Sequence, residues 1–205
     1  MRSQCALPMT PPVHDPSQEL PQPSAWVMRF APLLAPGASV LDLACGSGRH
    51  VRALAARGHA MHAVDRDVQA LEPLRGIAKV LVTDLETEPW PFGTQTFGGV
   101  VVTNYLWRPL LPHIVHAVAT EGVLIYETFA LGNETVGKPR NPDFLLRPGE
   151  LLDVARPALR VVAYEDGFVQ EPKPAYVQRI CAVRERMPAQ APVGSAERPP
   201  AQYNL

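Results

Sequence analysis

The chain has 205 residues, of which 46% are hydrophobic, so it can form the core of one ordinary domain. Charged residues nearly cancel to a formal net charge of -1. This balance disfavours a dedicated nucleic-acid-binding protein, because such proteins gain much of their affinity by neutralising phosphates. The odd number of cysteines, which lie far apart at positions 5, 45 and 181, predicts neither a disulfide framework nor a metal site.

Proline marks both ends of the chain. Six prolines lie between Pro8 and Pro23, and four more lie between Pro188 and Pro200. These stretches lack hydrophobic periodicity, so we expect disordered Pro-rich tails at residues 1–23 and 187–205 around a single domain at residues 24–186. The first residues do not have the pattern of a signal peptide, and no apolar run is long enough to cross a membrane. We therefore expect a cytoplasmic protein; the sequence predicts no particular oligomeric state.

Strand and helix patterns alternate through the central domain. We expect helices at Ala25–Leu34, at Arg49–Arg57, from a cap at Asp67 to Leu74, at Leu110–Ala119 and at Glu150–Ala155. The expected strands are Ser39–Ala44, His59–Val64, Ala78–Val82, Phe97–Thr103, Gly122–Glu127, Leu159–Tyr164 and Ala175–Val183. This order predicts an α/β fold, a doubly wound Rossmann-like sheet of seven mostly parallel strands with an antiparallel terminal strand.

Polar side chains follow the ends of several expected strands. They are Asp65, Asp84, Asn104 and Glu127. Ligands of open parallel sheets bind outside the carboxyl ends of the strands, so these side chains indicate a site at that edge.

The strongest local signal is the stretch Val40–Gly48, a strand that runs into a Gly-X-Gly turn before a helix. Gly46 and Gly48 permit a sharp turn and the close approach of a ligand. Asp65, nineteen positions after Gly46, is suited to the two hydroxyls of a ribose, although it is also placed to cap the helix near Asp67. The third glycine of a dinucleotide-binding turn would fall at Val51, so a nicotinamide or flavin site is disfavoured.

The stretch Asp42–Gly48 resembles the first motif of class I S-adenosylmethionine-dependent methyltransferases, and the resemblance extends over residues 40–183. It implies S-adenosylmethionine as cofactor, with Ala44, Cys45, Gly46, Ser47 and Gly48 at its methionyl part and Asp42 ordering that loop. It also implies that Asp65 binds the ribose and that Arg66 lies beside the adenine. Asp84 and the backbone of Leu85 would read the adenine amino group, while a turn-forming role is the alternative for Asp84.

The acceptor side is expected around the stretch Val102–Trp107, which in this family faces the transferred methyl group. Asn104, which would touch both cofactor and acceptor, is a catalytic candidate together with Tyr105 and Arg108. The stretch departs from the Asn-Pro-Pro-aromatic motif of methyltransferases that act on nucleobase amino groups. Such an acceptor is therefore disfavoured.

A long segment at Thr128–Leu146 resembles its counterpart in small bacterial methyltransferases of the tellurite-resistance type. Its glycines and aromatic residues indicate a lid over the acceptor. Its basic residues, with a neighbour just beyond it, either meet an anionic acceptor or are simply solvated; they are Lys138, Arg140 and Arg147.

The resemblance implies methyl transfer from S-adenosylmethionine, most simply to a small-molecule acceptor. An RNA or protein methyltransferase is one alternative, and a non-catalytic module that binds S-adenosylmethionine is another. No fixed catalytic dyad is expected, because the cofactor already carries the activated methyl group.

Overall fold

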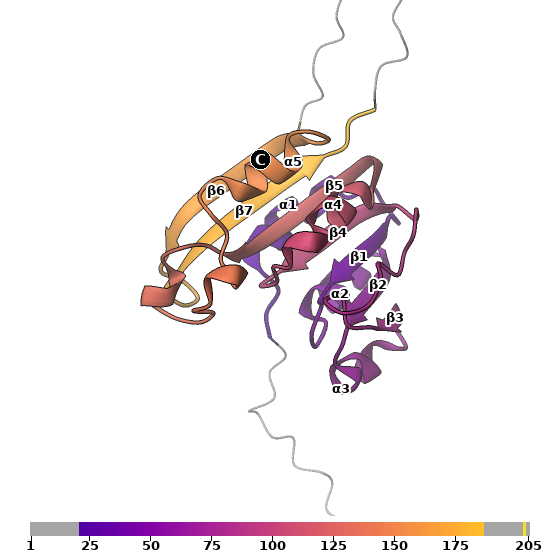
Figure 1. Cartoon of the computed structure of the whole chain (residues 1–205). Helices are drawn as coiled ribbons and strands as arrows, with labels where there is room; N and C mark the ends of the chain where they lie inside the picture. Colours follow the sequence, from indigo (N-terminus) through magenta and orange to yellow (C-terminus); the bar gives the residue numbers. More distant parts are fainter. Residues whose placement is uncertain (1–20, 187–202, 204–205) are drawn as a thin grey trace, which may run out of the picture.

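A computed structural model describes residues 21–186 and Tyr203 (Figure 1). Most of the two expected tails, residues 1–20, 187–202 and 204–205, therefore lies outside the described residues. Tyr203 contacts the domain: its ring lies 5.3 Å from the guanidinium carbon of Arg160, and its hydroxyl donates a 3.4 Å hydrogen bond to Glu185.

The fold is the expected doubly wound α/β sheet, with seven strands in the order β3-β2-β1-β4-β5-β7-β6. Strands β1 to β5 pair in parallel with their neighbours, whereas β7 is antiparallel to both β5 and β6. The carboxyl ends of β1 to β5 therefore meet at one edge of the sheet. The strands are β1 Ser39–Leu43, β2 Ala60–Asp65, β3 Ala78–Val82, β4 Phe97–Thr103, β5 Val118–Phe129, β6 Arg160–Val169 and β7 Ala175–Val183.

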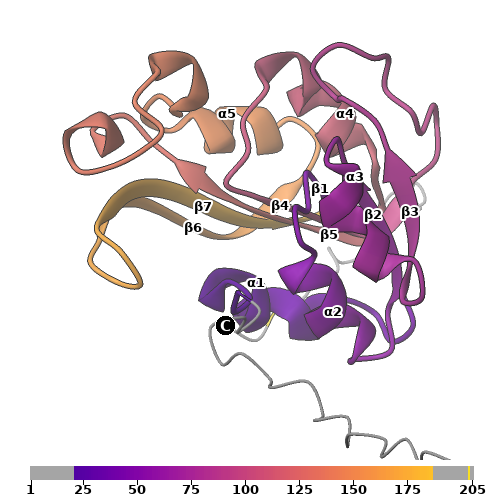
Figure 2. The ribbon, with the colours of Figure 1, turned by 90° about the horizontal axis from the view of Figure 1, so that it is seen from below.

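Short helices cover both faces of the sheet, as Figure 2 shows with α1 and α2 on one side and α4 and α5 on the other. The buried side chains of α3 join the core on the side of α1 and α2. Two expected helices are shorter than their patterns, because Pro32 and Pro73 each lie in a following 3-10 turn. The helices are α1 Ala25–Phe30, α2 Arg49–Ala55, α3 Val68–Leu71, α4 Leu111–His116 and α5 Glu150–Ala155.

Strand β5 is longer than its pattern predicted. It begins at Val118, and the helix expected to reach Ala119 ends at His116. Val118 pairs with Phe97 of β4, and the pairing then shifts by a bulge before Gly99. Glu121 takes a left-handed conformation in this bulge, so residues that read as a turn are part of the strand.

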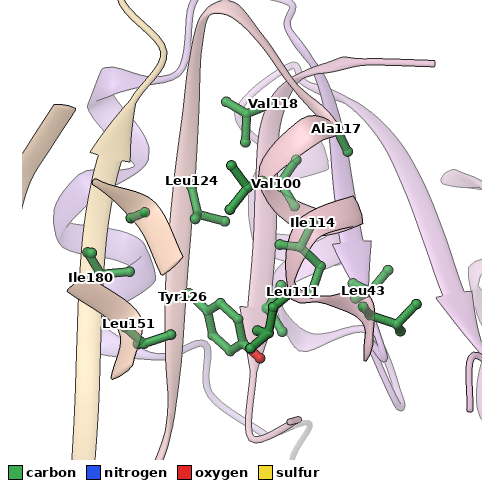
Figure 3. Close-up of a cluster of buried hydrophobic side chains, with 14 of the residues drawn as sticks. Leu43, Val100, Leu111, Ile114, Ala117, Val118, Leu124, Tyr126, Leu151 and Ile180 are labelled. Carbon is green, nitrogen blue, oxygen red and sulfur yellow. The ribbon is translucent and has the colours of Figure 1, made fainter. Parts of the chain in front are cut away.

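The core that supports the site lies between the sheet and the helices α4 and α5. Figure 3 shows Leu124 and Tyr126 of β5 gathered with Ile114 of α4 and Leu151 of α5. All four side chains are at most 1% exposed, and burial of each such side chain stabilises the fold by roughly 1.5 to 3 kcal/mol. The Tyr126 hydroxyl also donates a 2.8 Å hydrogen bond to the Tyr105 carbonyl, so this core fixes the turn that follows β4.

In the part of the chain that the structure describes, no helix has the length and apolarity needed to cross a membrane.

Candidate functional site

The turn after β1 is built from backbone conformations that few residues adopt. Ala44, Gly46 and Gly48 all have positive φ angles, of 53°, 54° and 76°. A Cβ at position 48 would lie 2.5 Å from a methyl carbon of Leu74, so a side chain there would have to displace Leu74 in a left-handed backbone conformation that favours glycine. A Cβ at position 46 would meet nothing within 4 Å, so the space above the loop is open for a ligand.

Asp65 joins this turn to the end of β2. Its carboxylate accepts hydrogen bonds from the backbone N–H of Gly46 at 2.8 Å and of Asp67 at 3.0 Å. The capping role that competed for Asp65 belongs to Asp67, whose side chain accepts from the first N–H groups of α3. A carboxylate has about four lone-pair positions, so Asp65 retains free acceptors for a ligand's hydroxyls.

The turn after β3 brings a second carboxylate to the same edge. Asp84 accepts a 3.0 Å hydrogen bond from the Glu86 N–H, which is the turn-forming role expected as an alternative. Its other oxygen lies 3.9 Å from the guanidinium of Arg66, which is largely exposed. The Asp84 side chain is nevertheless 31% exposed, so it remains open to a ligand.

These turns enclose a first pocket of about 260 Å³, which we call the carboxylate pocket. It brings together five of the residues predicted to bind the cofactor, namely Ala44, Asp65, Arg66, Asp84 and Leu85, with three that were not predicted as cofactor ligands, Thr83, Glu86 and Tyr105. The other residues predicted to bind the cofactor do not line it; they are Asp42, Cys45, Gly46, Ser47, Gly48 and Asn104.

Asp42 lies under the Gly-X-Gly turn in a dry environment. Both of its carboxylate oxygens are buried and lack a hydrogen-bond partner among the described residues. Burial raises the pKa of Asp42 to about 7 and lowers the pKa of His50, whose Nδ1 is 3.9 Å away, to about 3. Between about pH 3 and pH 7 the two groups are therefore both neutral and do not form an ion pair.

A buried polar chain runs from this pair toward β7. The His50 Nε2 accepts a 3.0 Å hydrogen bond from the Ser24 N–H, and the Ser24 hydroxyl donates to Glu127 at 2.9 Å. Glu127 in turn forms a 2.6 Å ion pair with Arg179. Glu127 therefore does not line either pocket. The sequence did not predict this series of polar contacts, because Ser24 shows only the pattern of a helix cap.

Cys45 is buried beside the same turn, and burial raises the pKa of its thiol well above the usual range. The thiol therefore stays protonated, which agrees with a packing role and not with a nucleophile.

The turn after β4 carries the acceptor-side candidates. Asn104 has a positive φ of 55°, and its N–H donates a 2.9 Å hydrogen bond to the Glu127 carbonyl. The Tyr105 hydroxyl is buried without a hydrogen-bond partner among the described residues. Burial raises the pKa of Tyr105, and the negative charge of Glu86 adds to the effect. Tyr105 therefore offers an unpaired donor that stays protonated.

A second pocket of about 190 Å³ begins at this turn, and we call it the aromatic pocket. Glu86 and Tyr105 line both pockets, so the two adjoin. The lining residues of the aromatic pocket are Glu86, Asn104, Tyr105, Leu106, Thr128, Phe129, Pro139 and Phe144.

The segment after β5 forms the outer wall of the aromatic pocket through Pro139 and Phe144. Leu145 and Leu146 are fully buried, and Ala130 forms a β-bridge with Leu146. The segment at 128–146 also contains two 3-10 turns, at Asn133–Thr135 and Pro142–Phe144. It is therefore an ordered segment, and the lid indicated by its sequence stays a prediction.

Arg108 holds this segment and lines neither pocket. Its guanidinium forms a bidentate ion pair with Glu150, at 2.7 and 2.9 Å. It also donates to the carbonyls of Asp143 and Leu145, at 2.6 and 2.8 Å. The geometry gives Arg108 a positioning role, in place of the contact with reactants that was expected from its sequence position.

The three basic residues that were candidates for an anionic acceptor also lie outside both linings. Lys138 and Arg140 are exposed on either side of Pro139. Arg147 is 70% exposed and lies 3.6 Å from Glu150. The solvated interpretation of these residues is therefore the one that the geometry favours.

Comparisons with known proteins agree with this architecture. Residues 40–121 match the family model of a methyltransferase domain. No curated protein matches the chain. Similar solved structures include TehB from Haemophilus influenzae, at 16% identity and a TM-score of 0.63, aligned over 78% of this chain and 61% of TehB. This chain therefore spans less than two thirds of TehB.

Two further structures are similar over most of both chains. A TehB-like SAM-dependent methyltransferase from Corynebacterium glutamicum has 22% identity and a TM-score of 0.54, covering 76% of this chain and 86% of its own. An S-adenosylmethionine-dependent methyltransferase from Mesorhizobium loti has 15% identity and a TM-score of 0.60, covering 78% and 98%. At these identities the likeness establishes the fold.

Proposed function

We propose that this chain is an S-adenosylmethionine-dependent methyltransferase whose methyl acceptor is a small molecule bound in the aromatic pocket; the match of residues 40–121 to a methyltransferase domain and the surrounding class I fold support the proposal. One observation carries the proposal: the two pockets adjoin at Glu86 and Tyr105, and the second is walled on its outer side by the chain's own residues.

The residues around the carboxylate pocket fit the cofactor. Asp65 accepts the ribose hydroxyls with the lone pairs that Gly46 and Asp67 leave free. Asp84 and the Leu85 backbone bind the adenine amino edge beside Arg66. The methionyl part lies over the turn at residues 44–48, where the absence of a Cβ at Gly46 leaves room.

Asp42 is a second indication that the residues of this site fit S-adenosylmethionine. Its two buried oxygens lack partners among the described residues, and unpaired buried polar atoms at a functional site indicate a missing hydrogen-bond donor. The cofactor's amino group, directly or through water, is such a donor.

When bound, S-adenosylmethionine supplies an activated methyl group on a positively charged sulfur. The chain's own residues then bind, orient and exclude water. Asn104 lines the aromatic pocket, and Tyr105, which lines both pockets, has a buried hydroxyl that can donate a hydrogen bond to a reactant. Phe129 and Phe144 exclude water from the acceptor side.

The size of the aromatic pocket supports a compact acceptor. Its volume of about 190 Å³ is below the roughly 300 to 1,000 Å³ that is usual for small-molecule sites. A nucleotide of an RNA or a side chain of a folded protein would enter across the segment that Arg108 holds against the domain. These features favour a metabolite over a macromolecule.

The test is transfer of a radiolabelled methyl group from S-adenosylmethionine to a cell extract separated by size. We expect label in the fraction that passes a small-pore filter and resists protease and ribonuclease. Label only in RNA or protein would overturn the small-molecule acceptor. Binding of S-adenosylmethionine with no transfer to any fraction would favour the non-catalytic module.

A further inference from the structure

The charge lining the aromatic pocket has one sign. Among the described residues that line it, Glu86 is the only charged side chain. No hydrogen bond or ion pair within the described part of the chain involves its carboxylate; only its backbone N–H is used, by Asp84. A half-buried carboxylate without a partner is costly unless a ligand or water satisfies it.

The basic side chains near the aromatic pocket have other partners or are exposed. Arg66, which lines the adjoining carboxylate pocket, lies 3.9 Å from Asp84. Arg108 is neutralised by Glu150 and by two carbonyls of the segment after β5. Lys138 and Arg140 flank a lining residue, Pro139, yet project into solvent and do not line the pocket. An anionic acceptor would therefore meet Glu86 without any compensating charge from the lining.

The remaining walls suit a cation as well. Tyr105, Phe129 and Phe144 contribute three aromatic rings to the lining. Aromatic faces attract ammonium groups through the negative potential above the ring. Burial raises the pKa of Tyr105, the negative charges of Glu86 and Asp84 raise it further, and the positive charge of Arg66 lowers it.

We propose that the acceptor is a compact molecule with a cationic group, such as an ammonium group that is charged at neutral pH, and that Glu86 is the residue that selects it. The methyl group is accepted by another atom of that molecule, because an ammonium nitrogen has no lone pair. This inference rests on the proposed function, because it assigns the acceptor to the aromatic pocket. Glu86 binds the charged nitrogen, and the rings of Tyr105 and Phe144 pack against the apolar body of the acceptor.

The inference is tested by binding and does not require the natural acceptor. The protein is first saturated with S-adenosylhomocysteine, the neutral product of the cofactor. Benzylamine, benzyl alcohol and benzoate are then titrated by calorimetry at pH 7.5, as cation, neutral molecule and anion of similar size. We expect benzylamine to bind at least about tenfold more tightly than the alcohol, and benzoate to bind most weakly.

Two variants distinguish the effect of Glu86 at the pocket from the effect of the protein's net charge. In Glu86→Gln the shape is retained, and the preference for benzylamine over benzyl alcohol should fall to within about twofold while S-adenosylhomocysteine still binds. The control Glu72→Gln makes the same change in net charge at an exposed site, where Glu72 pairs only with Arg75, and should leave the preference unchanged. If Glu86→Gln does not fold, Phe144→Leu should reduce the preference by about threefold, because it removes one ring.

Three results would overturn the inference. The first is binding of benzoate that is as tight as binding of benzylamine, and the second is a preference for benzylamine that survives in Glu86→Gln. The third concerns the cofactor, whose sulfonium is also a cation. If Glu86→Gln changed only the ratio of S-adenosylmethionine to S-adenosylhomocysteine affinity, Glu86 would serve the cofactor and not the acceptor. Failure of methyl transfer to small molecules is measured separately and bears on the proposed function alone.

Discussion

The two pockets are built in different ways. The carboxylate pocket is made of short turns whose residues bond to their near neighbours in the sheet, as Asp65 does with Gly46 and Asp67. The outer wall of the aromatic pocket is held by side chains that lie far away in sequence, chiefly Arg108 and Gln178. This difference implies that, apart from the shared Glu86 and Tyr105, the two pockets depend on separate contacts, so we expect that each can be disturbed without the other.

The largest expected effect is on the carboxylate pocket. Asp65→Ala should weaken S-adenosylhomocysteine binding by at least about a hundredfold, because hydrogen bonds to a charged group contribute roughly 1.5 to 3 kcal/mol each. The control Asp67→Ala removes the cap of α3, which costs about 1 kcal/mol of stability, but should leave the affinity nearly unchanged. Calorimetry on the folded variants measures both. Equal affinity in Asp65→Ala and wild type would remove Asp65 from the site.

Alanine substitutions at Gly46 and Gly48 should have different effects on stability and on cofactor affinity. Gly48→Ala should lower the free energy of unfolding by about 2 to 4 kcal/mol, because the new Cβ collides with Leu74 in a left-handed conformation. Gly46→Ala has only the conformational cost, about 1 to 2 kcal/mol, and its main effect should be lost cofactor affinity. Urea unfolding and calorimetry separate the two effects. Equal stability losses in the two variants would contradict the packing argument.

A substitution at Arg108 should loosen the outer wall of the aromatic pocket without changing the affinity for the cofactor. Arg108→Gln should destabilise the protein by about 2 to 3 kcal/mol, because Glu150 loses its bidentate partner and two carbonyls lose a donor. Proteolysis within residues 131–147 should accelerate, while S-adenosylhomocysteine affinity stays the same. The matched control is Arg147→Gln, which removes an exposed partner of the same Glu150 and should cost less than about 0.5 kcal/mol. Unchanged proteolysis in Arg108→Gln would show that other contacts hold the wall.

The smallest expected effect is on how stability depends on pH, and it involves Asp42 and His50, which lie under the Gly-X-Gly turn. Folding raises the pKa of Asp42 from 3.8 to about 7 and lowers the pKa of His50 from 6.5 to about 3. Between about pH 4 and 6.5 folding thus takes up a proton at Asp42 and releases one at His50, so their effects on stability cancel. In Asp42→Asn only the His50 effect remains, and stability should fall with acidification by up to about 1.4 kcal/mol per pH unit more than in wild type.

Urea unfolding at pH 4.5, 5.5 and 6.5 tests this prediction, with His50→Gln as the converse variant. His50→Gln leaves only the Asp42 effect, so its stability should rise relative to wild type as the pH falls. Parallel pH profiles for all three proteins would contradict the cancellation.

Much of the sheet could be predicted from the sequence. Phe97–Thr103 and Ala78–Val82 are strands with the expected bounds, because continuous apolar runs between turn residues leave little choice. The bulge at Glu121 was missed, since it arises from pairing with Phe97 and not from any local pattern. Local patterns were likewise sufficient to bring Asp65 and Asp84 to one pocket, where their roles stay predictions.

The acceptor side was harder to predict for a physical reason. Arg108 has the sequence position of a reactant-facing residue, and only the fold reveals that Glu150, 42 positions away, takes its guanidinium. Glu86 was passed over because an acid in a turn is usually solvated, and its place between two pockets depends on the packing of Tyr105 beside it. Contacts between distant segments decide such roles, and no short motif records them.

The strand order has a consequence for how the protein is made. Strand β7 lies between β5 and β6, although it is the last strand in the chain. During synthesis β6 therefore emerges before the only strand to which it pairs, and it must wait for residues 175–183 to leave the ribosome. The strands from β1 to β5 can associate earlier, because each of them adds to a neighbour that has already been made. The edge that carries the carboxylate pocket can thus form first, and we expect the insertion of β7 to complete the sheet as the last long-range step.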